Sequence, residues 1–220
     1  GLAALPVRAA GTQTLTARVA TAQIAPPNYA PTEVWSYDGT LPGPVLRVPQ
    51  GGRVTRRLAN ELPVPTSIHW HGIRIDNAMD GVAGLTQEAV PPAGAFDYDF
   101  AVPDAGTYWY HAHTNSFEQV ARGLSGALIV EETDAPDVDR DEGLVLDDWL
   151  LNPEDGQFAE PFGHPMSLSH GGRLGNLLGT NGTYDYAREV KAKDRLRLRL
   201  INASNARIFV LRLAGLEGWT

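Results

Sequence analysis

Four of the six histidines of this 220-residue chain stand in two short segments, each a His-x-His pair. The first pair is His69 and His71, and the second is His111 and His113. In a β-strand, side chains at positions i and i+2 point to the same face, roughly 6–7 Å apart. Two neighbouring strands would therefore aim four imidazoles at one place. Because imidazole binds copper, zinc, iron and nickel, this spacing predicts a metal site.

The spacing alone leaves the number of metal ions open. Four imidazoles can hold one ion tetrahedrally, or several ions that other ligands complete. A single His-x-His segment would be equally well explained by two histidines that bind no metal. The second segment, at the end of another aromatic strand, argues against this explanation. Trp70 and Ala112, between the paired histidines, must face the opposite side of their strands. We expect Trp70 to pack in the core there.

Short β-rich runs separated by Gly and Pro dominate the chain, and helical periodicity is scarce. This pattern is typical of a β-sandwich or barrel. One short helix is expected over residues 116–121, directly after the second histidine pair. The expected strands are residues 45–48, 53–58, 96–100, 106–110, 124–131 and 143–150, followed by a loop-like stretch over residues 151–175.

An internal repeat relates the two halves of the chain. Residues 48–60 align without gaps to residues 190–202, and residues 38–40 match residues 181–183. The second match, Asn181-Gly182-Thr183, is expected to form a turn. Two copies of one β-domain explain the repeat better than a single large domain.

We place the first domain at residues 1–133 and the second at 141–220, joined by an acidic linker over 134–140. The second copy holds about half the strands of the first, although a sandwich needs both sheets to bury its core. We therefore expect the chain to be part of a longer polypeptide or to be completed by a partner; a compact, reduced second domain is the alternative. The apolar residues expected to lie partly uncovered are Leu196, Leu198, Leu200, Ile208, Val210, Leu211 and Leu213.

Composition excludes several function classes. The formal net charge is −8 and no Lys/Arg-rich run occurs, which argues against a nucleic-acid surface. No apolar stretch approaches the ~20 residues that a membrane span needs. Cysteine is absent, so disulfides, thiolate metal sites and cysteine nucleophiles are excluded within these residues.

The flanks of the histidine pairs carry a family resemblance. Residues 35–44 (Trp-Ser-Tyr-Asp-Gly-Thr-Leu-Pro-Gly-Pro), the first pair, and residues 106–113 (Gly-Thr-Tyr-Trp-Tyr-His-Ala-His) resemble the first domain of a multicopper oxidase of the laccase-like bacterial branch. Residues 197–205 resemble the start of the second domain of the three-domain enzymes. The resemblance implies an all-β fold of cupredoxin-like Greek-key sandwiches, one complete and a second truncated.

By the same resemblance, the four histidines bind copper. His69 would bind the type 2 copper, His71 and His111 one copper of the type 3 pair, and His113 the other. These three coppers form the trinuclear centre at which dioxygen is reduced to water. Asp80 falls where the family often has a carboxylate that donates protons near that centre; a plain turn aspartate before a glycine is the equal alternative.

The chain departs from the family pattern because it lacks the Cys-His type 1 site and the remaining histidines of the trinuclear centre. The resemblance implies that a C-terminal cupredoxin segment with Cys and His ligands supplies them, so the type 1 copper is expected outside this chain. The reductant would be a phenol, an aromatic amine or a low-valent metal ion, and the acceptor O₂. A periplasmic or secreted location is also implied only by the resemblance.

Two alternatives to the oxidase stay open. One is a copper-binding or scaffold cupredoxin protein without oxidase activity. The other is a cupin-like mononuclear metal oxygenase, although Ile73-Arg74-Ile75 stands where its carboxylate ligand is usual. His164 and His170 lie in a Gly- and Pro-bounded segment with Met166, and are expected to be surface residues; an accessory copper-binding loop is the sharper alternative.

Overall fold

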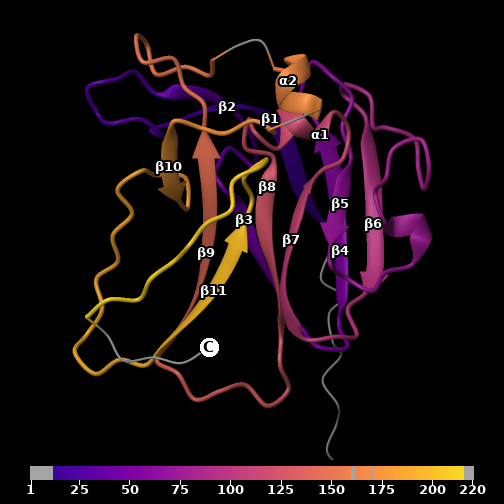
Figure 1. Cartoon of the computed structure of the whole chain (residues 1–220). Helices are drawn as coiled ribbons and strands as arrows, with labels where there is room; N and C mark the ends of the chain where they lie inside the picture. Colours follow the sequence, from indigo (N-terminus) through magenta and orange to yellow (C-terminus); the bar gives the residue numbers. More distant parts are fainter. Residues whose placement is uncertain (1–11, 160–161, 170, 216–220) are drawn as a thin grey trace, which may run out of the picture.

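The computed structural model describes residues 12–159, 162–169 and 171–215 and is nearly all β (Figure 1). Two four-stranded sheets enclose a common core, and a three-stranded sheet lies beside them. This architecture confirms the predicted sandwich. No helix within the described ranges has the length and apolar character to cross a membrane.

The first sheet has the order β2-β1-β4-β6, from β1 (Gln13–Ala22), β2 (Thr32–Tyr37), β4 (Arg53–Asn60) and β6 (Ala95–Ala101). The second has the order β3-β8-β7-β5, from β3 (Gly43–Pro49), β5 (Ile68–His71), β7 (Gly106–Ala112) and β8 (Ser125–Glu131). The third has the order β10-β9-β11, from β9 (Arg140–Trp149), β10 (Leu177–Thr180) and β11 (Leu196–Asn202). The helices are η1 (Asn77–Met79), α1 (Ser116–Gln119) and α2 (Pro165–Ser169).

The core between the first two sheets holds the histidine-bearing strands in place. Trp70 on β5 is fully buried and its ring centroid lies 5.4 Å from Tyr98 and 5.0 Å from Phe100, both on β6 of the opposite sheet. Ala112 on β7 is also buried in this core. Since side chains alternate along a strand, the neighbouring histidines face outward, as the sequence predicts.

The internal repeat is reproduced in the strand pairing. β1 pairs antiparallel with β2 and parallel with β4, and β9 pairs in the same way with β10 and β11. Asp38 and Asn181 occupy equivalent turns with positive φ. The Asp38 Oδ1 accepts the Thr16 N–H at 2.7 Å, and the Asn181 Oδ1 accepts the Val145 N–H at 2.9 Å. The third sheet is therefore a second copy of β1, β2 and β4 of the first sheet.

The third sheet buries one face and exposes the other. Ile201 on β11 packs against Ala127 and Ile129 on the outer face of β8. Leu198 and Leu200, on the opposite face of β11, are 45 % and 52 % exposed. The expectation of uncovered apolar residues is thus met for Leu198 and Leu200. It is also met for Ile208, Val210, Leu211 and Leu213, which are exposed.

Two segments differ from the sequence expectation. β9 begins at Arg140, three residues earlier than expected, because β11 pairs with it from Arg140 onward and draws the end of the acidic segment into the sheet. The stretch expected to be loop-like contains α2. The domain limits themselves remain a prediction.

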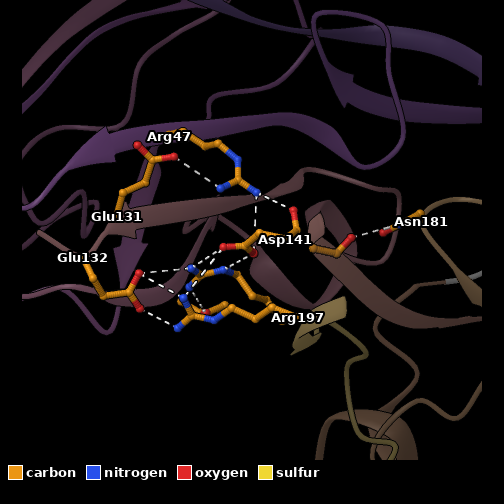
Figure 2. Close-up of polar contacts among 9 residues, drawn as sticks. Arg47, Glu131, Glu132, Asp141, Asn181 and Arg197 are labelled. Atoms are coloured by element: carbon orange, nitrogen blue, oxygen red, sulfur yellow. Dashed lines mark hydrogen bonds and ion pairs between the residues drawn. The ribbon is translucent and has the colours of Figure 1, made fainter. Parts of the chain in front are cut away.

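A cluster of arginines and carboxylates joins the third sheet to the second (Figure 2). Arg199 on β11 has a side chain only 2 % exposed, and its Nε and Nη2 donate to both carboxylate oxygens of Asp141 at 2.5 and 2.7 Å. Its Nη1 donates to the Thr107 Oγ1 on β7 at 3.0 Å. Arg197 pairs with Glu132 and lowers the pKa of that carboxyl to about 2.

We expect Asp141→Ala to destabilise the third sheet, because the buried Arg199 guanidinium on β11 loses its bidentate partner on the neighbouring strand β9. Breaking a buried pair costs roughly 3–5 kcal/mol, and the partial exposure of Asp141 reduces this to about 2–3 kcal/mol. Thermal unfolding of the copper-free full-length protein measures the loss. Asp97→Ala is the control, since the exposed Asp97–Arg57 pair contributes about 0–1 kcal/mol. Equal effects of the two variants would contradict the expectation.

Candidate metal centre

The β5–β7 register places the two histidine pairs together. His69 lies directly opposite His111, and His71 lies opposite Trp109. His113 follows the end of β7, and its backbone N–H donates to the Ser67 carbonyl at 3.2 Å. The ring of His69 lies 5.5, 5.3 and 5.2 Å from those of His71, His111 and His113, centroid to centroid. The structure thus brings the four imidazoles together, as predicted.

The ligand nitrogens of three of the four histidines form one close group. Ring nitrogens of His69, His71 and His111 lie within 4.8 Å of one another. The His71 Nδ1 and the His111 Nε2 are 3.3 Å apart. Two nitrogens that each bind one metal at about 2.0 Å with a tetrahedral angle are roughly 3.3 Å apart, so this spacing fits a shared ion. The ligand nitrogens of His113 fall outside the group, which fits a second ion.

Backbone carbonyls fix the tautomers of two of these imidazoles. The His69 Nδ1 lies 2.8 Å from the Asp80 carbonyl oxygen, and the His111 Nδ1 lies 2.9 Å from the Ala112 carbonyl oxygen. A carbonyl only accepts, so each Nδ1 carries the proton and each Nε2 keeps a free lone pair. This second contact on a histidine is the usual means by which proteins orient a metal ligand.

The electrostatic environment favours the neutral form of His71 and His111. Burial, together with the smaller effect of the neighbouring histidine charges, lowers the pKa of His111 to about 4. Burial, followed by the charges of His69 and His113, also lowers the pKa of His71. Metal binding needs the deprotonated ring, so His111 is ready to bind at neutral pH.

Three further residues surround the histidines. The Asp80 Oδ1 lies 3.3 Å from the His69 Nδ1, which places the candidate proton donor beside the site. The Trp109 ring lies 4.2 Å from the His111 ring and 5.2 Å from the His71 ring. Gly81 has a φ of +79°, and a Cβ on it would lie 1.7 Å from the Ile68 carbonyl oxygen.

Sequence reasoning did not assign the positioning roles of Trp109 and Gly81. Trp109 stands two residues before His111, so strand alternation places it on the histidine face. The signal for Gly81 was its place directly after Asp80, which suggested a turn but not that the turn lies against β5. That contact follows only from the tertiary structure.

The segment around His164 does not join the histidine cluster. His164 precedes α2, is exposed, and its Nδ1 accepts the Met166 backbone N–H at 3.3 Å. This contact caps the short helix. His170 lies outside the described residues, so the accessory copper loop stays an untested alternative.

Comparison with known proteins places the chain among copper oxidases. A family model described as "Multicopper oxidase" matches residues 18–135. Multicopper oxidase MmcO of Mycobacterium tuberculosis is 35 % identical over 207 residues, which cover 82 % of this chain and 40 % of that protein. Copper resistance protein A of Pseudomonas syringae pv. tomato is 45 % identical over 116 residues, covering 52 % of this chain and 19 % of the relative.

Solved structures give the same result for the fold. The multi-copper oxidase from Pseudomonas thermotolerans superposes with a TM-score of 0.83 at 38 % identity, over 89 % of this chain and 47 % of that chain. Lac15 from a marine microbial metagenome superposes with a TM-score of 0.80 at 45 % identity, over 94 % of this chain and 51 % of that chain. The chain therefore spans about half the length of these two structures, and it matches 40 % of the length of MmcO and 19 % of the length of Copper resistance protein A.

Proposed function

The chain belongs to the multicopper oxidase family, and from that premise we propose that it supplies half of the histidine ligands of a trinuclear copper centre. His69 binds the type 2 copper, His71 and His111 bind one type 3 copper, and His113 binds the other. The observation that carries the proposal is the 3.3 Å separation of the His71 Nδ1 and the His111 Nε2, which suits one shared ion.

Each residue of the site has a part in this function. Copper, when bound, supplies the one-electron chemistry that reduces dioxygen. The carbonyls of Asp80 and Ala112 hold the Nδ1 protons of His69 and His111, so that each Nε2 faces the metal. The Asp80 carboxyl, whose Oδ1 lies 3.3 Å from the His69 Nδ1, is the proton donor in this proposal.

The complete protein would be a laccase-like oxidase. It would oxidise a phenol, an aromatic amine or a low-valent metal ion, and reduce O₂ to water in a four-electron reaction. A C-terminal cupredoxin segment with Cys and His ligands would supply the type 1 copper and the other half of the trinuclear centre. A periplasmic or secreted location is part of this proposal.

The family assignment removes one of the two alternatives. A cupin-like oxygenase is excluded because the fold matches multicopper oxidases and contains an internal sandwich repeat. A copper-binding scaffold without oxidase activity shares the fold. Against it, all four histidines are present, and the ligand nitrogens of His69, His71 and His111 lie within 4.8 Å of one another.

The first experiment is the visible absorption spectrum of the full-length protein after copper loading and oxidation, with the copper content measured in parallel. We expect a strong thiolate-to-copper band, from the type 1 site, together with copper beyond that single ion. Chelation of the copper under reducing conditions should abolish both the band and oxygen consumption, and reloading should restore them. Bound copper without the band and without oxygen consumption would favour the scaffold and overturn the oxidase.

A further inference from the structure

A buried carboxyl lies on the third sheet, close to the strand that carries His111. Asp147 on β9 is only 6 % exposed, and its Oδ1 accepts the Asp148 backbone N–H at 2.8 Å. Its Oδ2 has no hydrogen-bond partner among the described residues. The next carboxyl, Asp148, is held instead by Arg207 at 2.9 Å. Asp147 is therefore buried without a salt bridge, and one of its carboxylate oxygens has no hydrogen-bond partner among the described residues.

A small cavity separates Asp147 from β8. Its volume is about 10 Å³, and Asp147, Ser125 and Trp149 are among its lining residues. A space of this size is at the lower limit for one water molecule, which needs two to four polar partners. The Asp147 carboxyl and the Ser125 hydroxyl are two, and the buried, unpartnered Trp149 Nε1 is available as a third.

Ser125 connects this cavity to the histidine site. In the β7–β8 pairing Ser125 lies directly opposite His111, so both side chains project from the same face of the sheet. Directly opposed residues have Cβ atoms about 5 Å apart. On its other side the small cavity shares Pro42 and Val145 with an open pocket of about 290 Å³ between β3 and β9, which leads to solvent.

We propose that Asp147 is a proton-relay residue that passes protons from this pocket through Ser125 to the histidine site. The inference rests on the proposed function, because reduction of dioxygen to water consumes one proton for each electron taken from the reductant. In each relay step the Asp147 O–H bond breaks as the cavity water accepts the proton. That water gives a proton to the Ser125 Oγ, which releases its own proton into the histidine site, where the oxygen that is being reduced to water takes it up. Solvent in the open pocket returns a proton to the Asp147 carboxylate.

The charges around Asp147 suit this role. Burial, with a smaller contribution from the Asp148 charge, raises the pKa of Asp147 to about 7. The Asp148 backbone N–H and the Arg173 guanidinium, from the segment before β10, act in the opposite direction. β8 presents no charge here, only the Ser125 hydroxyl. The carboxyl thus exchanges its proton near neutral pH, and the protonated fraction falls as the pH rises through about 7.

Infrared spectroscopy of the copper-free full-length protein tests the carboxyl directly. We expect a protonated-carboxyl C=O band that disappears with a midpoint near pH 7 and is absent from Asp147→Asn. This readout does not depend on copper or on turnover. A spectrum in which Asp147→Asn changes no carboxyl band between pH 5 and 9 would overturn the inference.

Kinetics of the copper-loaded full-length protein test the relay. We expect Asp147→Asn and Ser125→Ala to lower kcat by about 10-fold or more at pH 6, with wild-type copper content, type 1 band and KM for the reductant. Ser125→Thr, which keeps the hydroxyl, should restore most of the rate. Thr107→Val removes a hydroxyl at the same sheet contact but outside the cavity, and should leave kcat within about twofold.

The outcomes separate this inference from the proposed function. Full copper content and wild-type kcat in both Asp147→Asn and Ser125→Ala would overturn the relay and leave the oxidase intact. Equal losses in Thr107→Val would also overturn it, because the effect would then be structural. A wild-type protein that binds copper without reducing oxygen would refute the proposed function, and the relay with it.

Discussion

His111→Ala in the full-length protein is expected to abolish oxygen reduction while the blue type 1 absorption remains. His111 is the most buried of the four histidines, and its Nε2 is the nitrogen that pairs with the His71 Nδ1 across 3.3 Å. Removal of an outer partner of a metal ligand already costs 10–100-fold, so the loss of the ligand itself should exceed about 100-fold. An oxygen electrode and copper analysis measure the two effects separately.

The matched control is His164→Ala. His164 is a histidine of the same chain, but it is exposed and caps α2 rather than joining the cluster. Its substitution should leave copper content and oxygen consumption at the wild-type level. Oxygen consumption that persists in His111→Ala would refute the assignment of the trinuclear site, whatever the control shows.

Gly81→Ala is expected to damage the site without touching a histidine. Its φ of +79° strains any residue with a Cβ. That Cβ would lie 1.7 Å from the Ile68 carbonyl oxygen and 3.0 Å from the backbone nitrogen of His69. Both contacts are to backbone, so β5 or the loop that carries Asp80 must move. We expect copper content to fall and the thermal unfolding temperature to drop by several degrees.

Gly84→Ala separates the clash from the strain. Gly84 has nearly the same φ, +78°, yet a Cβ there meets nothing within 4 Å. The backbone strain of about 1–2 kcal/mol is common to the two variants. The overlap with β5 adds about 1–3 kcal/mol to Gly81→Ala alone. Copper binding that is equally intact in both variants would show that the Gly81 contact does not position His69.

The sequence was most informative where one physical rule governs both the pattern and the structure. Strand alternation placed His69 and His71 on one face and Trp70 on the other, and the structure confirms this arrangement. The repeat predicted that residues 190–202 copy a strand of the first half, which β11 reproduces in its parallel pairing with β9. These inferences needed only local spacing.

What the sequence did not predict depends on contacts between distant segments. Asp147 and Asp148 stand together in an apolar strand, and this pattern indicated buried charge. The local sequence did not predict that Asp148 pairs with Arg207 while Asp147 faces Ser125. The bidentate contact of Arg199 with Asp141 likewise joins two strands 58 residues apart. The two ion pairs depend on the pairing of β9 with β11 within the third sheet, and the contact of Asp147 with Ser125 depends on how that sheet lies on the second.

Asp80 serves His69 with two different atoms, and this division affects how the two neighbouring positions tolerate change. The carbonyl that fixes the His69 tautomer belongs to the main chain, so every amino acid at position 80 offers it; the carboxylate belongs to the side chain, and only aspartate and glutamate carry one. A saturation library at position 80 would therefore rank side chains by their proton chemistry, with ligand orientation held constant. The same library at position 81 should retain little besides glycine. The side chain at position 80 thus determines the proton chemistry beside His69, and the residue at position 81 determines whether the loop can lie against β5.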